Sequence, residues 1–356
     1  MRIYVCHRCH RILPPQERCG ACANPIQIEQ PESFVGRTIG VWKLERVIGL
    51  GAMGAVYASS IDDRRAALKL MIPDDDDATM VTRFIREAQL LSQLRHPHIV
   101  EGFESGTGEW GTPYFAMELL RGRTLRDEMR DRPQGLPLQE ALRHTRQLAQ
   151  GLLFAHERGV IHRDLKPENI FLVESPTGPP VDKILDFGLA KSVLRTREPR
   201  LTRSGIVLGT PAYLAPEQAQ NVELGPWTDQ YAFALLVAEM LTGRKMRQDV
   251  GLAQIVTVEI ARPLPAERVA SAKPPPHVVA ALQRATQPDP ADRFADVEDF
   301  VRALEDRPTR TRRERKISPG AVHIEHPRVT RRRTAWLVLA ALLVVAAGVA
   351  AWLLLR

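Results

Sequence analysis

The hydrophobic pattern of this chain of 356 residues changes its period partway along, and this change constrains the fold most strongly. Alternating or continuous apolar residues, separated by glycine and charged turns, are typical of strands and occur at 42–48, 55–59 and 66–71. Apolar residues at helical spacing follow at 79–94, 138–156 and 229–242. A strand-rich first part and a helix-rich remainder predict an α+β protein with two lobes.

A glycine-rich segment joins the first two predicted strands. Residues 49–56 read G-x-G-x-x-G-x-V, and glycine lets backbone amides come close to phosphate oxygens. A dinucleotide-binding loop of similar pattern needs a helix to begin at the third glycine, whereas a second strand follows here. The segment therefore predicts a hairpin turn over a nucleotide, with contacts from Ile48, Gly49, Leu50, Gly51, Ala52, Met53, Gly54, Ala55 and Val56.

A lysine and a glutamate follow the glycine-rich segment at informative positions. Lys69 lies near the end of an apolar strand, and Glu87 lies on the amphipathic segment 79–94. Alone, Lys69 would be read as a solvated surface lysine. After a glycine-rich hairpin, however, a Lys69–Glu87 ion pair is expected to hold the α- and β-phosphates of ATP.

Three short motifs carry the strongest functional signal. Residues 162–169 read HRDLKPEN, 186–188 read DFG and 215–217 read APE. With the glycine-rich segment and Lys69, they resemble the eukaryotic-type protein kinase family in order and spacing. The resemblance is greatest to membrane-anchored bacterial serine/threonine kinases. It implies a β-rich N-lobe and a helical C-lobe over residues 38–306.

The resemblance assigns a role to each polar residue of these motifs. Asp164 is expected to accept the proton of the substrate hydroxyl, and Lys166 to neutralise the γ-phosphate, as in serine/threonine-specific members. Asn169 and Asp186 match the ligands of Mg²⁺ or Mn²⁺, and oxygen donors suit these hard ions. The implied activity is transfer of the γ-phosphate of ATP to protein serine and threonine hydroxyls.

The resemblance also places the adenine pocket at the junction of the two lobes. Residues 117–120 resemble the hinge, where backbone groups of Glu118 and Leu120 are expected to hydrogen-bond the base. Val56 and Ala67 would pack on its upper face. Phe171 falls beneath the base, where the family more often has leucine or methionine, although it could equally be an ordinary core aromatic residue.

Regulation and bracing of the site are implied by further residues. Arg163 precedes the catalytic aspartate and would bind a phosphate on the activation segment, 186–217. Thr202 and Ser204 are the best-placed acceptors for autophosphorylation. Glu217 and Arg293 resemble the buried ion pair that braces the large lobe in this family. Asp229 resembles the residue that anchors the catalytic loop.

Two other functions compete with an active protein kinase. A membrane-tethered pseudokinase scaffold would normally lack one of the catalytic residues, yet Lys69, Asp164, Asn169 and Asp186 are all present. A small-molecule phosphotransferase of similar fold would lack the full HRDLKPEN and APE set. Both are disfavoured.

The first 30 residues contain every cysteine of the chain, arranged as two C-x-x-C pairs: Cys6, Cys9, Cys19 and Cys22. Four thiolates at this spacing predict a tetrahedral structural zinc site in a small zinc ribbon, residues 1–30. A redox-active thiol pair and c-type haem attachment at the Cys9-His10 pair are the alternatives. Haem attachment is disfavoured because it occurs outside the cytoplasm.

The C-terminal part of the chain predicts a membrane anchor. Residues 335–355 are uncharged and largely apolar, long enough as a helix to cross about 30 Å of hydrocarbon. The linker 307–334 has ten Arg or Lys residues against two Glu, an excess that accounts for the net charge of +7. A basic segment beside an apolar one favours anionic lipid over nucleic acid.

The positive-inside rule predicts a single-pass membrane protein with its kinase domain in the cytoplasm. Only Arg356 follows the apolar segment, and the start of the chain lacks the apolar core of a signal peptide. Regulatory input is expected through the zinc head, through a homodimer in the membrane, or through the activation segment.

Overall fold

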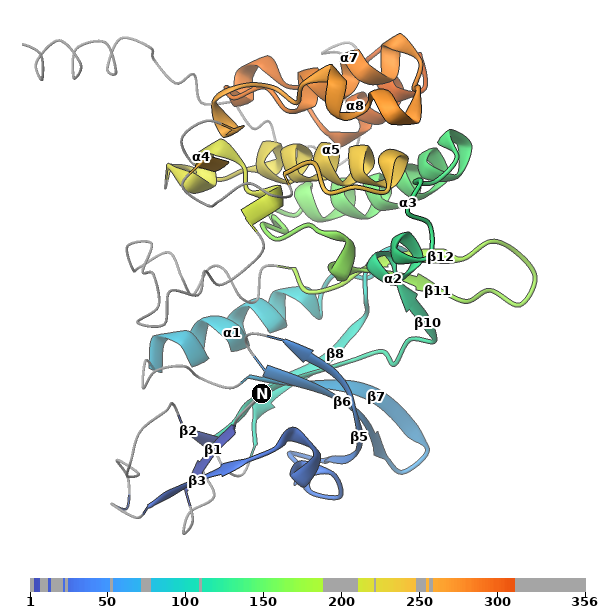
Figure 1. Ribbon diagram of the computed structural model, residues 1–356. Coiled ribbons are helices and arrows are strands. Elements are labelled where there is room, and N and C mark those ends of the chain that lie inside the picture. The colour runs from blue at the N-terminus through green and yellow to red at the C-terminus, as the bar shows by residue number, and fades with distance from the viewer. Residues whose placement is uncertain are drawn as a thin grey trace, which may run out of the picture.

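The computed structural model has two lobes, one built on strands and one on helices (Figure 1). The structure describes residues 3–6, 12–13, 22, 25–51, 54–71, 78–108, 111–187, 211–220, 222–247, 254–255 and 259–310. The change from strands to helices falls where the hydrophobic period changes, and the predicted two-lobed α+β fold is confirmed.

The small lobe is built on a six-stranded antiparallel sheet with the order β4-β5-β6-β7-β9-β8. Its strands are β4 (Thr38–Ile39), β5 (Trp42–Gly51), β6 (Gly54–Ile61), β7 (Arg64–Met71), β8 (Gly102–Thr107) and β9 (Pro113–Met117). The three strands predicted at 42–71 lie within β5, β6 and β7. Helix α1 (Ala78–Leu91) corresponds to the predicted helix 79–94, but ends three residues earlier.

The large lobe consists mainly of helices. They are α2 (Leu125–Arg130), α3 (Leu138–His156), α4 (Pro216–Ala219), α5 (Pro226–Thr242), α7 (Pro276–Ala285) and α8 (Val297–Leu304). Helix α5 is apolar around most of its circumference because it is buried on all sides from Trp227 to Thr242. A small antiparallel sheet joins this lobe to the hinge; its strands are β10 (Gly122–Thr124), β11 (Ile170–Val173) and β12 (Val181–Ile184).

The cysteine-containing head forms a three-stranded antiparallel sheet of order β2-β1-β3 beside the small lobe (Figure 1). Its strands are β1 (Ile3–Cys6), β2 (Ile12–Leu13) and β3 (Ile26–Glu29). Cys9 and Cys19 lie outside the described residues, as does the side chain of Cys6. Among the described residues no cluster of three or more His, Cys, Asp or Glu could hold a metal, so the predicted zinc site stays a prediction.

The buried apolar residues form two clusters on opposite faces of the small-lobe sheet. The inner cluster joins Ala67, Met71 and Phe115 to α1 and continues into the large lobe. The outer cluster contains Tyr57, Leu68 and other sheet residues, together with Ile3 and Val5 of β1. This sheet is therefore covered on both faces.

The packed structure of the large lobe continues to Arg310, beyond the predicted boundary at residue 306. The guanidinium of Arg310 forms ion pairs with Asp296, with Glu298 (2.6 Å) and with Asp299 (3.3 Å) at the start of α8.

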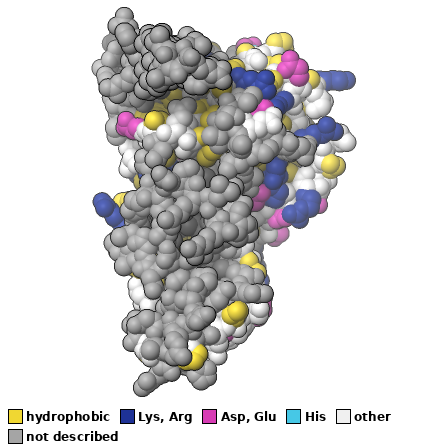
Figure 2. Space-filling view, turned by 60° about the vertical axis from the view of Figure 1, so that its left-hand side comes forward, with side chains coloured by type: hydrophobic (Ala, Val, Ile, Leu, Met, Phe, Trp, Pro, Cys, Tyr) yellow, Lys and Arg dark blue, Asp and Glu magenta, His cyan; other side chains and the backbone are white. Residues whose placement is uncertain are grey.

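No helix in the described part of the chain is both long and apolar enough to span a membrane. The predicted membrane segment 335–355 lies outside that part. In the view of Figure 2, basic and acidic side chains are interspersed over the described surface.

Candidate active site

The glycine-rich segment forms the predicted hairpin. Strands β5 and β6 are paired in register as far as Gly51 and Gly54, with Gly49 opposite Val56. Ala52 and Met53, at the tip, lie outside the described residues. Ile48 and Leu50 are exposed on β5, whereas Ala55 is buried and Val56 packs against the inner cluster. The hairpin therefore has the arrangement expected of a cover over a nucleotide.

Lys69 is directed to the inner face of the sheet by the alternation of β7. It pairs with Phe115 on β9, while its neighbours Leu68 and Leu70 belong to the outer cluster. Its ammonium nitrogen lies 2.7 Å from Oδ1 of Asp186. Glu87 is on α1, but its side chain lies outside what the structure describes, so the predicted Lys69–Glu87 pair remains a prediction.

The catalytic loop brings Asp164, Lys166 and Asn169 together. Lys166 Nζ donates to Asp164 Oδ2 at 2.8 Å. The 3-10 turn η2 (Pro167–Asn169) brings Asn169 back toward Asp164, and its amide donates to the Asp164 carbonyl at 2.8 Å. The carboxylate of Asp164 is thus held beside a cation and keeps an exposed edge, with 17% of its side chain accessible.

Asn169 and Asp186 are brought close together by the backbone. The N–H of Leu185, the residue before Asp186, donates to the carbonyl of Asn169 at 2.8 Å. Their side chains offer a carboxylate and an amide oxygen, a donor set that fits Mg²⁺. Asp186 lies in a left-handed backbone conformation, with φ of +49°. Residues that must reach a reacting group often occupy such uncommon conformations.

Asp229, at the start of α5, holds the catalytic loop from below. Its carboxylate accepts hydrogen bonds from the backbone N–H groups of His162 (2.7 Å) and Arg163 (2.8 Å), and from Nε2 of His156 (2.7 Å). Burial alone would raise the pKa of Asp229, but the hydrogen bond and charge of His156, with His162, outweigh burial and lower it. Asp229 is therefore ionised, as an anchor for two N–H groups requires.

His162 links the catalytic loop to the segment that carries Asp186. Burial lowers the pKa of His162, which favours the neutral imidazole. Its Nε2 lies 2.8 Å from the carbonyl of Leu185 and must donate, because a carbonyl only accepts. Nδ1 is then free to accept from the backbone N–H of Asp164 at 3.2 Å. The ring of Phe187 packs against it, with the two ring centroids 4.8 Å apart.

The buried ion pair implied by the family resemblance is formed. Arg293 donates from Nη1 and Nη2 to the two carboxylate oxygens of Glu217, both at 2.9 Å. Its guanidinium also donates to the carbonyls of Trp227, Gln287 and Pro288. Arg293 and Glu217 are nearly inaccessible, so this pair fixes the end of the activation segment to the large lobe.

The regulatory residues are only partly described. Arg163 has φ of +65°, and its carbonyl accepts from the side chain of Gln218 at 2.9 Å. Gln218 therefore connects the catalytic loop to α4. Thr202 and Ser204 lie outside the described residues, so their predicted phosphorylation is neither supported nor contradicted by the structure.

The hinge carries an ion pair that sequence reasoning missed. Lys183 of β12 pairs with Oε1 of Glu118 at 2.5 Å, and the same oxygen accepts from the backbone N–H of Glu101 at 2.8 Å. The N–H of Glu118 itself donates to the Glu101 carbonyl, so the carbonyl of Glu118 is the group that can meet adenine. Leu120 is half-buried beyond it.

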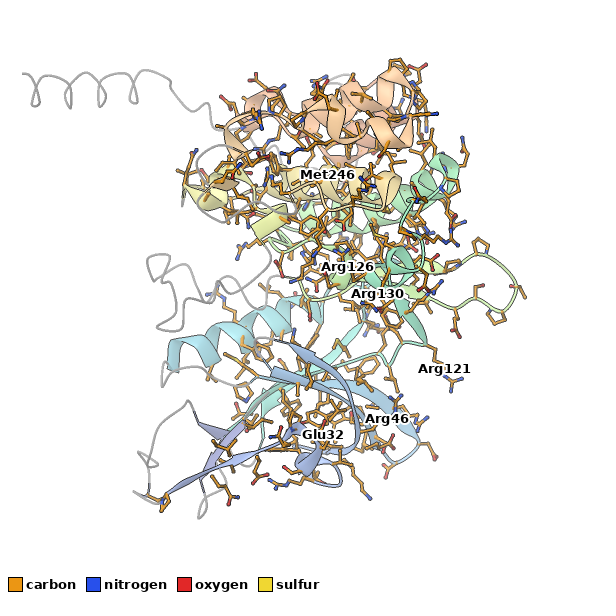
Figure 3. The ribbon with its side chains drawn as sticks, viewed as in Figure 1. Glu32, Arg46, Arg121, Arg126, Arg130 and Met246 are labelled. Atoms are coloured by element: carbon orange, nitrogen blue, oxygen red, sulfur yellow. The ribbon has the colours of Figure 1, made fainter. Side chains whose placement is uncertain are left out.

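A second unpredicted network surrounds Arg126 of α2, which Figure 3 labels in the middle of the molecule. Its guanidinium donates to Glu168 (2.8 Å), Glu239 (2.7 Å) and the hydroxyl of Tyr213 (2.9 Å). Tyr213 in turn donates to Glu239. These residues are far apart in the sequence, which explains why no local pattern indicated them.

Comparison with known proteins agrees with this geometry. The family model described as the protein kinase domain matches residues 42–304. Serine/threonine-protein kinase pkn3 of Myxococcus xanthus is 35% identical over 283 residues, which cover 77% of this chain and 51% of the relative. Serine/threonine-protein kinase PknA of Mycobacterium tuberculosis is 33% identical over 308 residues, 81% of this chain and 68% of the relative.

Solved structures give the same result. The crystal structure of the Mycobacterium tuberculosis PknI kinase domain matches with a TM-score of 0.61 and 29% identity, covering 76% of this chain and 98% of that one. The chain spans about half the length of its Myxococcus relative. Because the family model covers well over half of the sequence and the predicted catalytic residues converge in one site, this chain belongs to the protein kinase domain family.

Proposed function

We propose that this protein is an ATP-dependent serine/threonine protein kinase. The observation that carries the proposal is the convergence of Asp164, Lys166 and Asn169 on one loop, with Asp186 beside it and paired to Lys69. The similarity to two bacterial proteins named serine/threonine-protein kinases supports the substrate class.

Each residue has a defined task in the transfer. The hydroxyl oxygen of the substrate attacks the γ-phosphorus of ATP, and the bond between the γ-phosphorus and the β,γ-bridging oxygen breaks. Asp164 accepts the proton that the hydroxyl loses. Lys166 neutralises charge on the transferred group, and Lys69 exchanges Asp186 for the phosphates of ATP. Asn169 and Asp186 would hold Mg²⁺ or Mn²⁺, which supplies charge neutralisation between the phosphates.

The adenine is bound between the lobes. The backbone of Glu118 and Leu120 supplies its hydrogen bonds, Val56 and Ala67 cover it, and Phe171 lies on the large-lobe side. Ala67 is buried and pairs with Met117, the first residue of the hinge, which supports this assignment.

The test is phosphate transfer by the full chain. Purified protein is incubated with Mg²⁺-ATP and a generic protein substrate, and phosphoserine and phosphothreonine are identified by mass spectrometry. Asp164→Ala should abolish the signal, while Asp292→Ala, an exposed aspartate of the large lobe, should retain it. Equal signals from wild type and Asp164→Ala would reject the proposal. ATP binding with no transfer would favour a pseudokinase scaffold.

Regulation through the activation segment is a second part of the proposal. Arg163 is held in place beside Asp164 by bonds from its backbone to Asp229 and Gln218. A phosphate on Thr202 or Ser204 would bind the guanidinium of Arg163 through charge-assisted hydrogen bonds. Full activity of the Thr202→Ala/Ser204→Ala double variant would reject this regulation.

We also propose that residues 335–355 anchor the protein in a membrane, with the kinase domain on the cytoplasmic side. Support comes from the length of the apolar segment and from the basic linker that precedes it. Fractionation of cells should find the full chain in membranes that resist alkaline extraction. A chain truncated after Arg310 should be found in the soluble fraction, and the same distribution for both would contradict the anchor.

For the head we propose a structural Zn²⁺ bound by Cys6, Cys9, Cys19 and Cys22. Support comes from the two C-x-x-C pairs and from the sheet pairing of Cys6, the last residue of β1, with Ile26 of β3, which follows Cys22 closely in the sequence. Elemental analysis should find about one zinc per chain, lost on replacing all four cysteines by serine. A zinc-free protein that contains a disulfide would favour the redox alternative.

A further inference from the structure

The outer face of the small-lobe sheet is as completely buried as its inner face. Antiparallel sheets commonly leave one face in water. Here the outer side chains Tyr57, Leu68 and Ala116 are each 0% exposed, and Leu70 is 1% exposed. Some other part of the chain must therefore cover this face.

The N-terminal segment supplies part of that cover, beside Phe34, Ile39 and Trp42 of the same apolar cluster. Ile3 (1% exposed) and Val5 (0%) of β1 belong to the same apolar cluster as Tyr57, Leu68 and Leu70. They lie on one face of the head sheet, because alternate residues of a strand share a face. Ile28 of β3 pairs with Tyr4 and thus lies on that opposite face, where it is 51% exposed.

Polar contacts hold the connection between the head and the small lobe in a defined position. Glu29, the last residue of β3, forms an ion pair with Arg37 at 2.7 Å. The hydroxyl of Tyr57 donates to the carbonyl of Pro31 at 2.9 Å, directly after the head. The head is thus docked on the small lobe and does not behave as a separate module on a free tether.

A single layer of β-sheet separates the head from the nucleotide side of the small lobe. Leu68 and Leu70 lie in the outer cluster, which also contains Ile3 and Val5 of the head, and Lys69 between them pairs with Asp186 on the other face. A shift of β7 that follows loss of packing on Leu68 or Leu70 would move Lys69 as well, since the three residues share one backbone.

We propose that the N-terminal sheet β1–β3 is an intramolecular effector of the nucleotide site. Its docking on the outer face of the small lobe fixes β7 and so holds Lys69 in position for ATP. The identity of the bound nucleotide rests on the proposed kinase function, whereas the coupling between the head and β7 does not. A change in the head then alters the nucleotide site although no residue that contacts ATP is itself changed.

The test compares two substitutions on opposite faces of the head sheet in the full chain. Val5→Ser places a hydroxyl in the outer cluster, and Ile28→Ser makes a matched change on the exposed face. Binding of Mg²⁺-ADP is measured by displacement of a fluorescent ADP analogue, and the exchange of β7 amide hydrogens is measured by mass spectrometry. Val5→Thr, which nearly preserves the side-chain volume, serves if Val5→Ser does not fold.

Val5→Ser should raise the dissociation constant of Mg²⁺-ADP about fivefold or more, a usual size for coupling between two sites, and should speed exchange in β7. Ile28→Ser should change neither. A folded Val5 variant with unaltered ADP affinity and unaltered β7 exchange would overturn the proposal, even if its melting temperature fell. If the wild type binds ADP but transfers no phosphate, the proposed kinase activity fails while this coupling can still be measured.

Discussion

Replacing Asp229 by asparagine should disable the catalytic loop while leaving the fold largely intact. The side chain keeps its shape, but one carboxylate oxygen becomes an NH₂ group that donates and cannot accept. The best arrangement keeps the oxygen that serves His162 and His156, so the NH₂ group faces the backbone N–H of Arg163. That N–H loses its partner in a fully buried position.

The magnitude follows from the bonds observed. A hydrogen bond to a charged acceptor contributes about 1.5–3 kcal/mol, and Asp229→Asn loses one of the three. Arg163 is held at φ of +65°, a conformation that costs about 1–3 kcal/mol for a residue with a side chain. The lost bond is as large as the strain it opposes, so the backbone of Arg163 should relax and displace Asp164.

A loss of about 1.5–3 kcal/mol in the aligned state corresponds to roughly a 10- to 150-fold fall in kcat. Steady-state phosphorylation and thermal unfolding of the full chain should be measured together, with Asp292→Asn as the exposed control. The affinity for Mg²⁺-ADP should stay within about threefold, because the small lobe and hinge are untouched. A kcat within twofold of wild type, or a loss of activity matched by the unfolded fraction, would refute this account of Asp229.

Other predictions concern buried charges. Arg293→Met should destabilise the large lobe by about 3–5 kcal/mol in denaturant unfolding, and adding Glu217→Met should recover part of the loss; additive effects would contradict the pairing. Arg126→Met should cost a similar amount by leaving Glu239 buried without its cation, whereas Arg126→Lys should restore part of it. Because the folded-state pKa of Asp229 is lowered, its contribution to stability is present above about pH 4 and is lost as pH falls through the folded value. Wild type should therefore lose stability more steeply than Asp229→Asn in thermal unfolding below pH 4.

The residues of the catalytic loop were predictable because their chemistry is local in sequence. Asp164, Lys166 and Asn169 lie within six residues, and a single turn is enough to bring them together. The Glu217–Arg293 pair spans 76 residues, and only the family resemblance could predict it. The Lys183–Glu118 pair and the Arg126 network span 65 and up to 113 residues. No periodicity encodes such pairs, because each depends on how separate elements meet.

The sequence of β7 contains a local signal for the docking of another segment on its outer face. Residues 66–71 form a nearly continuous apolar run, which on a sheet with one solvated face would place alternate apolar side chains in water. The run therefore required a cover on the outer face of β7 as well as on the inner one. Only the direction of each side chain in the structure shows that Leu68 and Leu70 point outward, into the apolar cluster that β1 joins. It follows that the cysteine-containing head should be considered part of the small lobe, because Ile3 and Val5 share one apolar cluster with Leu68 and Leu70, the two neighbours of Lys69.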